Sequence, residues 1–70
     1  MTVKIKEEFI KLDSLLKLSG VAETGGTAKM IIKNGLVSVN NEVCLMRGKK
    51  IRPTDKVSVN GEIITVSYEG

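Results

Sequence analysis

The sequence predicts a small α+β domain in which two helices pack on a short, twisted antiparallel sheet. Its first half spaces apolar residues as amphipathic helices do, whereas its second half alternates apolar and polar residues. The second half also contains Asn40-Asn41 and Asn60-Gly61, two residue pairs that suit tight hairpin turns. A chain of 70 residues buries one small core, so we expect a single domain over residues 1–70.

Two helices are expected in the first half of the chain. The apolar spacing predicts the first helix over Phe9–Leu18, with Phe9 in the stripe that faces the core. Gly20 follows and suits the left-handed conformation that closes a last helical turn. Thr24 is a suitable N-cap for a second helix over Gly26–Asn34, which a further glycine terminates.

The strands are expected mainly in the second half. Thr2–Ile5 alternates weakly and predicts one short strand near the start. Residues 36–45 and residues 56–66 each predict a hairpin around its asparagine-containing turn. Between the hairpins, residues 46–50 predict an exposed basic loop, which a turn at Pro53 joins to the next strand.

The residue types exclude several classes of function. Histidine is absent and there is one cysteine, so transition-metal sites and histidine-dependent nucleophilic sites lack their ligands and bases. Neither of the glycine-rich phosphate-loop patterns occurs. We therefore expect no enzyme, no metal, no cofactor and no small-molecule substrate. A lone cysteine indicates a reducing compartment, and charges interrupt every apolar run near the start, so we expect a cytoplasmic protein without a membrane segment.

Positive charge is concentrated in the middle of the chain. The net charge is +3, but residues 24–53 alone carry six basic residues against one acid, Glu42. A local excess of this kind attracts a polyanion. Lys11, on the polar side of the first expected helix, is a further candidate for the same surface. The six basic residues are Lys29, Lys33, Arg47, Lys49, Lys50 and Arg52.

The start of the second expected helix has features of a phosphate site. Gly25 and Gly26 lack a Cβ, so a phosphate can approach the free N–H groups behind Thr24 and the positive end of the helix dipole. Lys29 and Lys33 are one turn apart and share a solvent face. Taken singly, each feature is more often a cap, a turn or a solvated surface, so the interpretation requires that folding bring them together.

Aromatic residues discriminate among modes of RNA binding. Proteins that read single-stranded RNA stack its bases on exposed aromatic rings. The only aromatic residues are Phe9, which is expected in the core, and Tyr68, near the end of the chain. The sequence therefore favours recognition of phosphates at the fixed spacing of a folded RNA.

The order of these features resembles the ribosomal-protein-S-four-like RNA-binding domain, also called the alpha-L motif. Residues 10–16 (IKLDSLL) resemble its opening helix, and residues 24–41 (TGGTAKMIIKNGLVSVNN) resemble its central signature. The resemblance covers nearly the whole chain and is greatest to the small free-standing bacterial members. It implies RNA-facing positions at Lys11, Thr24, Lys29, Lys33, Arg47, Lys49, Lys50 and Arg52.

The chain departs from the family pattern at three places. Many members have arginine at the position of Lys11 and Ser-Arg at the position of Thr24-Gly25. The loss of that second arginine removes a bidentate phosphate donor, for which backbone N–H groups at Gly25-Gly26 would substitute. Asn41 replaces a common hairpin glycine and tolerates the same positive φ.

We therefore expect a non-enzymatic, monomeric RNA-binding protein whose partner is a structured RNA. The resemblance implies ribosomal RNA and a role in ribosome assembly. One alternative is a helix-turn-helix DNA-binding module, although Gly25, Gly26 and Thr27 give its recognition helix few side chains that read bases. Another alternative is a protein-interaction adaptor that uses an exposed sheet edge.

Overall fold

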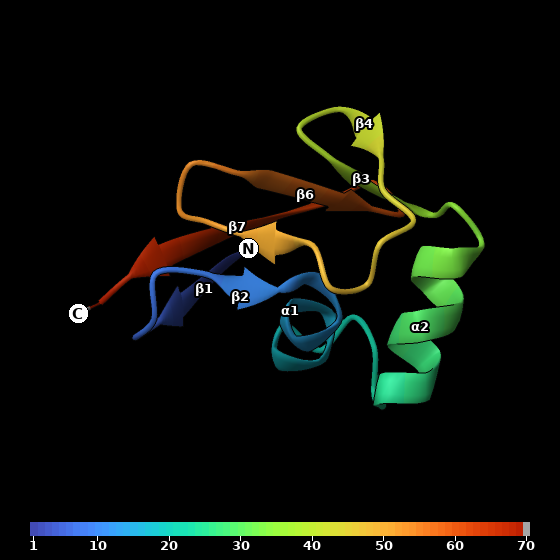
Figure 1. Cartoon of the computed structure of the whole chain (residues 1–70), viewed down its shortest axis with the longest axis horizontal. Coiled ribbons are helices and arrows are strands. Elements are labelled where there is room, and N and C mark those ends of the chain that lie inside the picture. Colours follow the sequence, from blue (N-terminus) through green and yellow to red (C-terminus); the bar gives the residue numbers. More distant parts are fainter. Residues whose placement is uncertain (70) are drawn as a thin grey trace.

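The structure is a computed structural model that describes residues 1–69. Two helices and a two-stranded ladder lie on one side of a five-stranded sheet (Figure 1). The strands of the large sheet, in spatial order, are β1 (Thr2–Ile5), β7 (Glu62–Tyr68), β6 (Lys56–Val59), β3 (Val37–Val39) and β4 (Glu42–Val43). The ladder pairs β2 (Ile10–Lys11) with β5 (Lys50–Ile51), and the helices are α1 (Leu12–Leu18) and α2 (Gly25–Lys33).

The α+β class with two helices is confirmed, but the sheet is mixed rather than wholly antiparallel. β1 pairs in parallel with β7, from Thr2 opposite Thr65 to Ile5 opposite Tyr68. Parallel neighbours need a long crossover connection, and here nearly the entire domain separates the two strands. The turn residues in the sequence predict only antiparallel pairing between strands that follow one another in the chain. They therefore could not predict the parallel pairing of β1 with β7.

The first helix is shorter than expected because the segment before it pairs with the basic loop. α1 begins at Leu12, whereas residues 10–11 form a strand against Lys50 and Ile51. The N–H groups of Leu12 and Asp13 donate to the carbonyl oxygens of Lys49 (2.9 Å) and Arg47 (3.0 Å). The loop backbone thus satisfies helix donors that a side chain usually caps. The prediction of a helix from residue 9 was wrong, and Lys11 is a strand residue.

The second helix and both hairpin turns follow the sequence closely. α2 begins one residue earlier than expected, and the Oγ1 of Thr24 accepts a hydrogen bond from the N–H of Thr27 at 3.1 Å. Both residues of the Asn40-Asn41 turn have positive φ, at 52° and 71°, as do Asn60 at 50° and Gly61 at 83°. Positive φ at both central residues defines the turn type that matches the twist of a hairpin.

The core lies between the helices, the β2–β5 ladder and one face of the large sheet, where buried and exposed residues alternate along β1, β6 and β7. The β5 residue Ile51 is fully buried in this core, so its side chain fixes β5 to the core. No helix within residues 1–69 is long and apolar enough to cross a membrane. The largest fully buried side chains are Leu12, Leu15, Leu16, Ile32, Ile51 and Ile64.

Candidate nucleic-acid interface

Every residue proposed from the sequence as RNA-facing is exposed in the structure. Solvent exposure is necessary for contact with a large polyanion, but it does not by itself bring the residues together. The structure places them in separate groups, and the segment from residue 47 to residue 52 contributes residues to each group. The ten exposed residues are Lys11, Thr24, Gly25, Gly26, Lys29, Lys33, Arg47, Lys49, Lys50 and Arg52.

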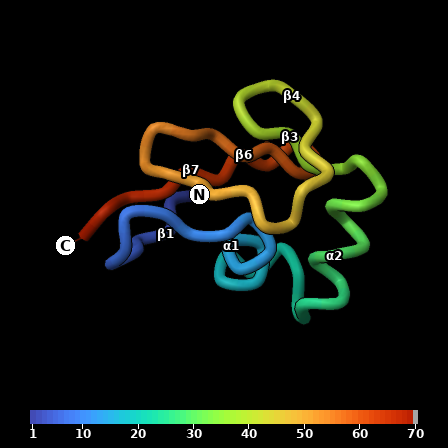
Figure 2. The backbone as a smooth tube through the Cα atoms, viewed as in Figure 1, coloured from blue at the N-terminus to red at the C-terminus, as the bar shows by residue number. Residues whose placement is uncertain are grey.

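One group combines the outer face of α2 with the basic loop. Lys29, Lys33 and Arg47 line a single groove of about 300 Å³, together with the apolar side chains of Ile32 and Leu45. Figures 1 and 2 show the chain after β4 passing beside α2 before it turns into β5. We call this hollow the α2 groove. Three cations from two distant parts of the sequence therefore meet there, as the phosphate-site interpretation requires.

The start of α2 continues the same helical stripe. Gly25, Lys29 and Lys33 are spaced at i, i+4 and i+8, so they follow one face of the helix. The N–H groups of Thr27 and Ala28 are already bonded to Thr24, and those of Gly25 and Gly26 belong to the first turn, which has no partners within the helix. A Cβ added at Gly25 would meet no atom within 4 Å. This helix end is open to a ligand.

A second group surrounds an aromatic ring that sequence reasoning assigned to the core. Lys50 Nζ lies 4.9 Å from the centroid of the Phe9 ring, and Arg52 Cζ lies 5.9 Å from it. Lys11 stands directly opposite Lys50 in the β2–β5 ladder, so their side chains share the face away from the core. We call these four residues the Phe9 cluster. Phe9 itself is half-buried, and the prediction that it belongs to the core was wrong.

A signal in the sequence pointed away from a helix at Phe9. The three residues before it are Lys6, Glu7 and Glu8, and none of them is a residue type that commonly caps a helix N-terminus. The apolar spacing alone predicts a helix from residue 9, because Phe9 continues the stripe of Leu12 and Leu15.

Lys49 belongs to neither group. Its side chain lines a different hollow of about 370 Å³, beside the β3–β4 hairpin, with the half-buried Cys44 and the exposed Leu45 and Met46. The backbone of the basic loop is nevertheless held firmly, since the carbonyl groups of Arg47 and Lys49 both accept hydrogen bonds from α1. The backbone of the loop is therefore fixed, and its cationic side chains point to different sides of the loop.

An acid lies closer to this surface than the sequence indicated. Burial opposes ionisation of Asp55, but hydrogen bonds from the Arg52 N–H (2.8 Å) and the Asn40 amide (2.9 Å) outweigh it. Together with the charges of Lys49 and Arg52, they hold the pKa of Asp55 below its ordinary value. Asp55 therefore offsets part of the positive potential around Lys49 and Arg52.

Within residues 1–69, none of the cations of this surface forms an ion pair with a carboxylate. Within residues 1–69 the only ion pair joins Lys4 Nζ to Glu69 Oε1 at 3.8 Å. The same residues contain no group of three side chains suited to bind a metal ion. The positive charge of the α2 groove is therefore available to an external anion.

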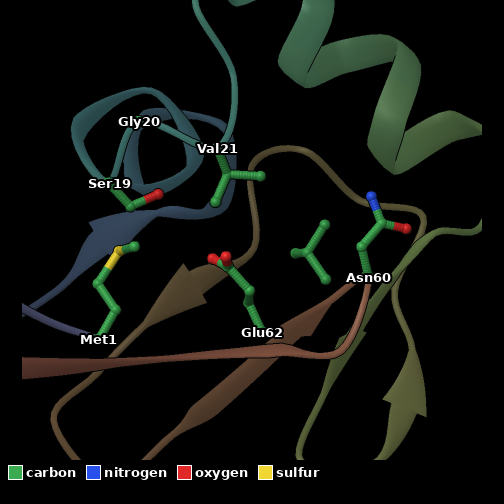
Figure 3. A pocket seen from close by; sticks show the side chains of 7 residues that line it. Met1, Ser19, Gly20, Val21, Asn60 and Glu62 are labelled. Carbon is green, nitrogen blue, oxygen red and sulfur yellow. The ribbon is translucent and has the colours of Figure 1, made fainter.

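A further hollow, of about 320 Å³, lies between the end of α1 and the β6–β7 turn (Figure 3). Glu62 is the one charged side chain that lines it, and the labelled side chains of Val21 and Asn60 border the same space. An anion would meet no basic side chain there. The lining residues are Met1, Ser19, Gly20, Val21, Val59, Asn60 and Glu62.

Comparisons with known proteins agree with this fold. The chain is 37% identical over 59 residues to the probable ribosome maturation protein RlbA of Bacillus subtilis, covering 84% of this chain and 83% of that one. The solution structure of YbcJ from Escherichia coli, described as an alpha-L motif involved in RNA binding, aligns with a TM-score of 0.71 at 34% identity. That alignment covers 94% of this chain and 85% of YbcJ.

The same fold occurs inside a larger ribosomal protein. The 30S ribosomal protein S4e of Thermoplasma acidophilum aligns with a TM-score of 0.66 at 29% identity, over 83% of this chain. This chain spans only 31% of that protein, so it matches one part of it. The family model described as the S4 domain matches residues 3–67. The chain therefore belongs to the S4 domain family of RNA-binding domains.

Proposed function

We propose that this domain recognises a folded RNA through phosphates bound along α2 and the basic loop. The observation that carries the proposal is the α2 groove, which Lys29, Lys33 and Arg47 line together and which no acidic side chain lines. Arginine and lysine in one hollow favour phosphate oxygens, because arginine donates two parallel hydrogen bonds and lysine adds a point charge. The open first turn of α2 supplies backbone donors at the end of the same stripe.

We further propose that the RNA is ribosomal and that binding serves maturation of the ribosome. A relative of similar length is named as a probable ribosome maturation protein, which supports this assignment. A surface with fixed cations reads the spacing of phosphates in a folded backbone rather than a base sequence. S4 domains are typically non-enzymatic, and we propose a binding role without catalysis here.

A competition experiment tests the proposal against the DNA-binding alternative. A dye-labelled hairpin from ribosomal RNA is bound to the purified protein, and displacement by unlabelled ribosomal RNA or by double-stranded DNA is followed by fluorescence anisotropy. We expect the structured RNA to displace the probe at lower concentration than the DNA. Equal or stronger displacement by DNA would favour a helix-turn-helix mode, although α2 begins with Gly25, Gly26 and Thr27, which offer little base readout.

One observation favours the adaptor as a second candidate function. β4 is an edge strand; its residue Val43 is 63% exposed, and Leu45 and Met46, which follow it, are 63% and 66% exposed. Exposed apolar side chains at an unpaired edge suit a protein partner. That function predicts complexes from cells that survive nuclease and high salt, whereas complexes that depend on RNA dissociate under both treatments.

A further inference from the structure

Phe9 occupies an unusual place for the only phenylalanine of the chain. It lies in the connection between β1 and β2, one residue before the ladder begins. The half-buried apolar residues that pack on the core within residues 1–69 are Ile10, Val21, Ile31 and Cys44, and Phe9 is not among them. The partial burial of the ring therefore does not come from the core.

Cations cover this ring from the neighbouring segment. Lys50 and Arg52 are both exposed, and their charged ends lie 4.9 Å and 5.9 Å from the ring centroid. Ile10 and Ile51, which are paired across the ladder, point into the core and fix the backbone beneath. The ring and its cations thus lie together on the solvent side of the ladder, with Lys11 opposite Lys50.

The contacts in the free protein are weak enough to be exchanged. A cation over an exposed aromatic ring shifts an equilibrium by a factor of about 2 to 5. Stacking of a nucleobase on an aromatic side chain changes affinity by about 5- to 150-fold. A base therefore competes favourably for the ring, and the displaced cations remain within reach of the phosphates that flank that base.

We propose that Phe9 is a stacking platform for one unpaired nucleobase of the bound RNA, with Lys11, Lys50 and Arg52 binding the adjoining phosphates. This inference rests on the proposed function, because it adds a base-recognising site to the phosphate-binding surface. The S4 domain of this chain would then bind a loop, bulge or end of a folded RNA in preference to an uninterrupted duplex, whose bases are already stacked.

The absence of tryptophan makes the site directly observable. Phe9→Trp introduces a single indole whose fluorescence is quenched when a base stacks on it. The probes are an RNA hairpin with an unpaired loop and inorganic polyphosphate, a polyanion without bases. The control is Ile63→Trp, because Ile63 is 51% exposed on the opposite face of β7 from the buried Ile64. Binding itself is followed independently by the anisotropy of dye-labelled wild-type complexes.

We expect the hairpin to quench Phe9→Trp, polyphosphate to leave its emission nearly unchanged, and Ile63→Trp to respond to neither. If the hairpin binds but Phe9→Trp is not quenched, or if polyphosphate quenches it equally, the stacking inference is overturned while the proposed function stands. If the hairpin and ribosomal RNA both fail to bind the wild-type protein, the proposed function fails and the stacking site fails with it.

A second variant separates stacking from a structural role of the ring. Phe9→Leu keeps an apolar side chain at this position but removes the aromatic face. We expect about fivefold or greater loss of affinity for the looped hairpin and less than about twofold loss for a blunt RNA duplex. An equal loss for both RNAs would show that Phe9 only holds its cations in place and would overturn the inference. Urea unfolding of the variant establishes that the fold is intact.

Discussion

Arg47 is the residue on which the α2 groove most depends. It is the one groove cation that does not come from α2, and its backbone carbonyl is held by the N–H of Asp13 at 3.0 Å. Arg47→Met removes the charge while it keeps the stem and the backbone hydrogen bond. The side chain is exposed, so we expect the free energy of unfolding to change by less than about 0.5 kcal/mol. Any loss of RNA affinity then reports on the interface.

The size of that loss follows from counterion release. Each phosphate neutralised contributes about 0.9 to the steepness of log K against log salt, and the cations of the surface suggest about five such contacts and a slope of about −4.5. Loss of one contact makes the slope shallower by about 0.9. At about 0.15 M salt the same contact accounts for about a fivefold change in affinity.

The assay is a salt titration of RNA binding for the wild-type protein, Arg47→Met and a matched control. Lys4→Met is the control, because Lys4 carries the same kind of exposed charge but lies on β1 beside Glu69, outside the proposed surface. We expect Arg47→Met to lower both affinity and slope, and Lys4→Met to leave both nearly unchanged. Equal effects of the two variants would mean that net charge, and not the α2 groove, determines binding.

Three further predictions concern the helix start, the acid and a turn. Gly25→Ala should raise the free energy of unfolding by about 0.5 kcal/mol, because alanine favours a helix and its Cβ meets no atom within 4 Å. The same Cβ should weaken RNA binding, because it crowds the free N–H groups of the first turn. Thermal unfolding measures the first effect and fluorescence anisotropy the second. The lowered pKa of Asp55 means that its ionised form is stabilised by folding, so the contribution is present above about pH 4 and is lost as the pH falls below that value. Urea midpoints across this range should show the step in the wild type and not in Asp55→Asn. Gly61→Ala should lower Tm by about 4–8 °C, since a side chain at φ 83° costs about 1 kcal/mol; an unchanged Tm would contradict the turn assignment.

Local signals in the sequence specify those parts of the fold that local chemistry determines. Thr24 caps α2 through its own hydroxyl, and the two hairpin turns follow from residues that tolerate positive φ. The pairing of β1 with β7 and of β2 with β5 joins segments far apart in the chain. No turn residue connects either pair directly, so the sequence gives no local signal for these pairings. The boundary of α1 was missed for the same reason, because the groups that cap it belong to the basic loop.

The candidate surface shows the same division between local and distant effects. Lys29 and Lys33 could be placed on one face from their spacing alone, and their meeting with Arg47 was expected only if the fold brought the loop to α2. Phe9 and Asp55 could not be placed, because the side of the molecule that each faces depends on the β2–β5 ladder and on the turn at Pro53. Both residues lie beside Arg52: its guanidinium lies 5.9 Å from the centroid of the Phe9 ring, and its backbone N–H donates to the carboxylate of Asp55 at 2.8 Å.

Under the two proposals, this placement would give the basic segment two separable roles. Arg47 faces the α2 groove and Lys50 faces Phe9, although only two residues lie between them and α1 holds the intervening backbone. A phosphate in the groove and a base on the ring would therefore be read at a fixed separation. Because a duplex keeps its bases stacked, only an RNA with an unpaired nucleotide near a regular backbone satisfies both groups at once. A double variant of Arg47→Met with Phe9→Leu should then lose affinity for the looped hairpin by about the product of the single losses, as independent contacts do.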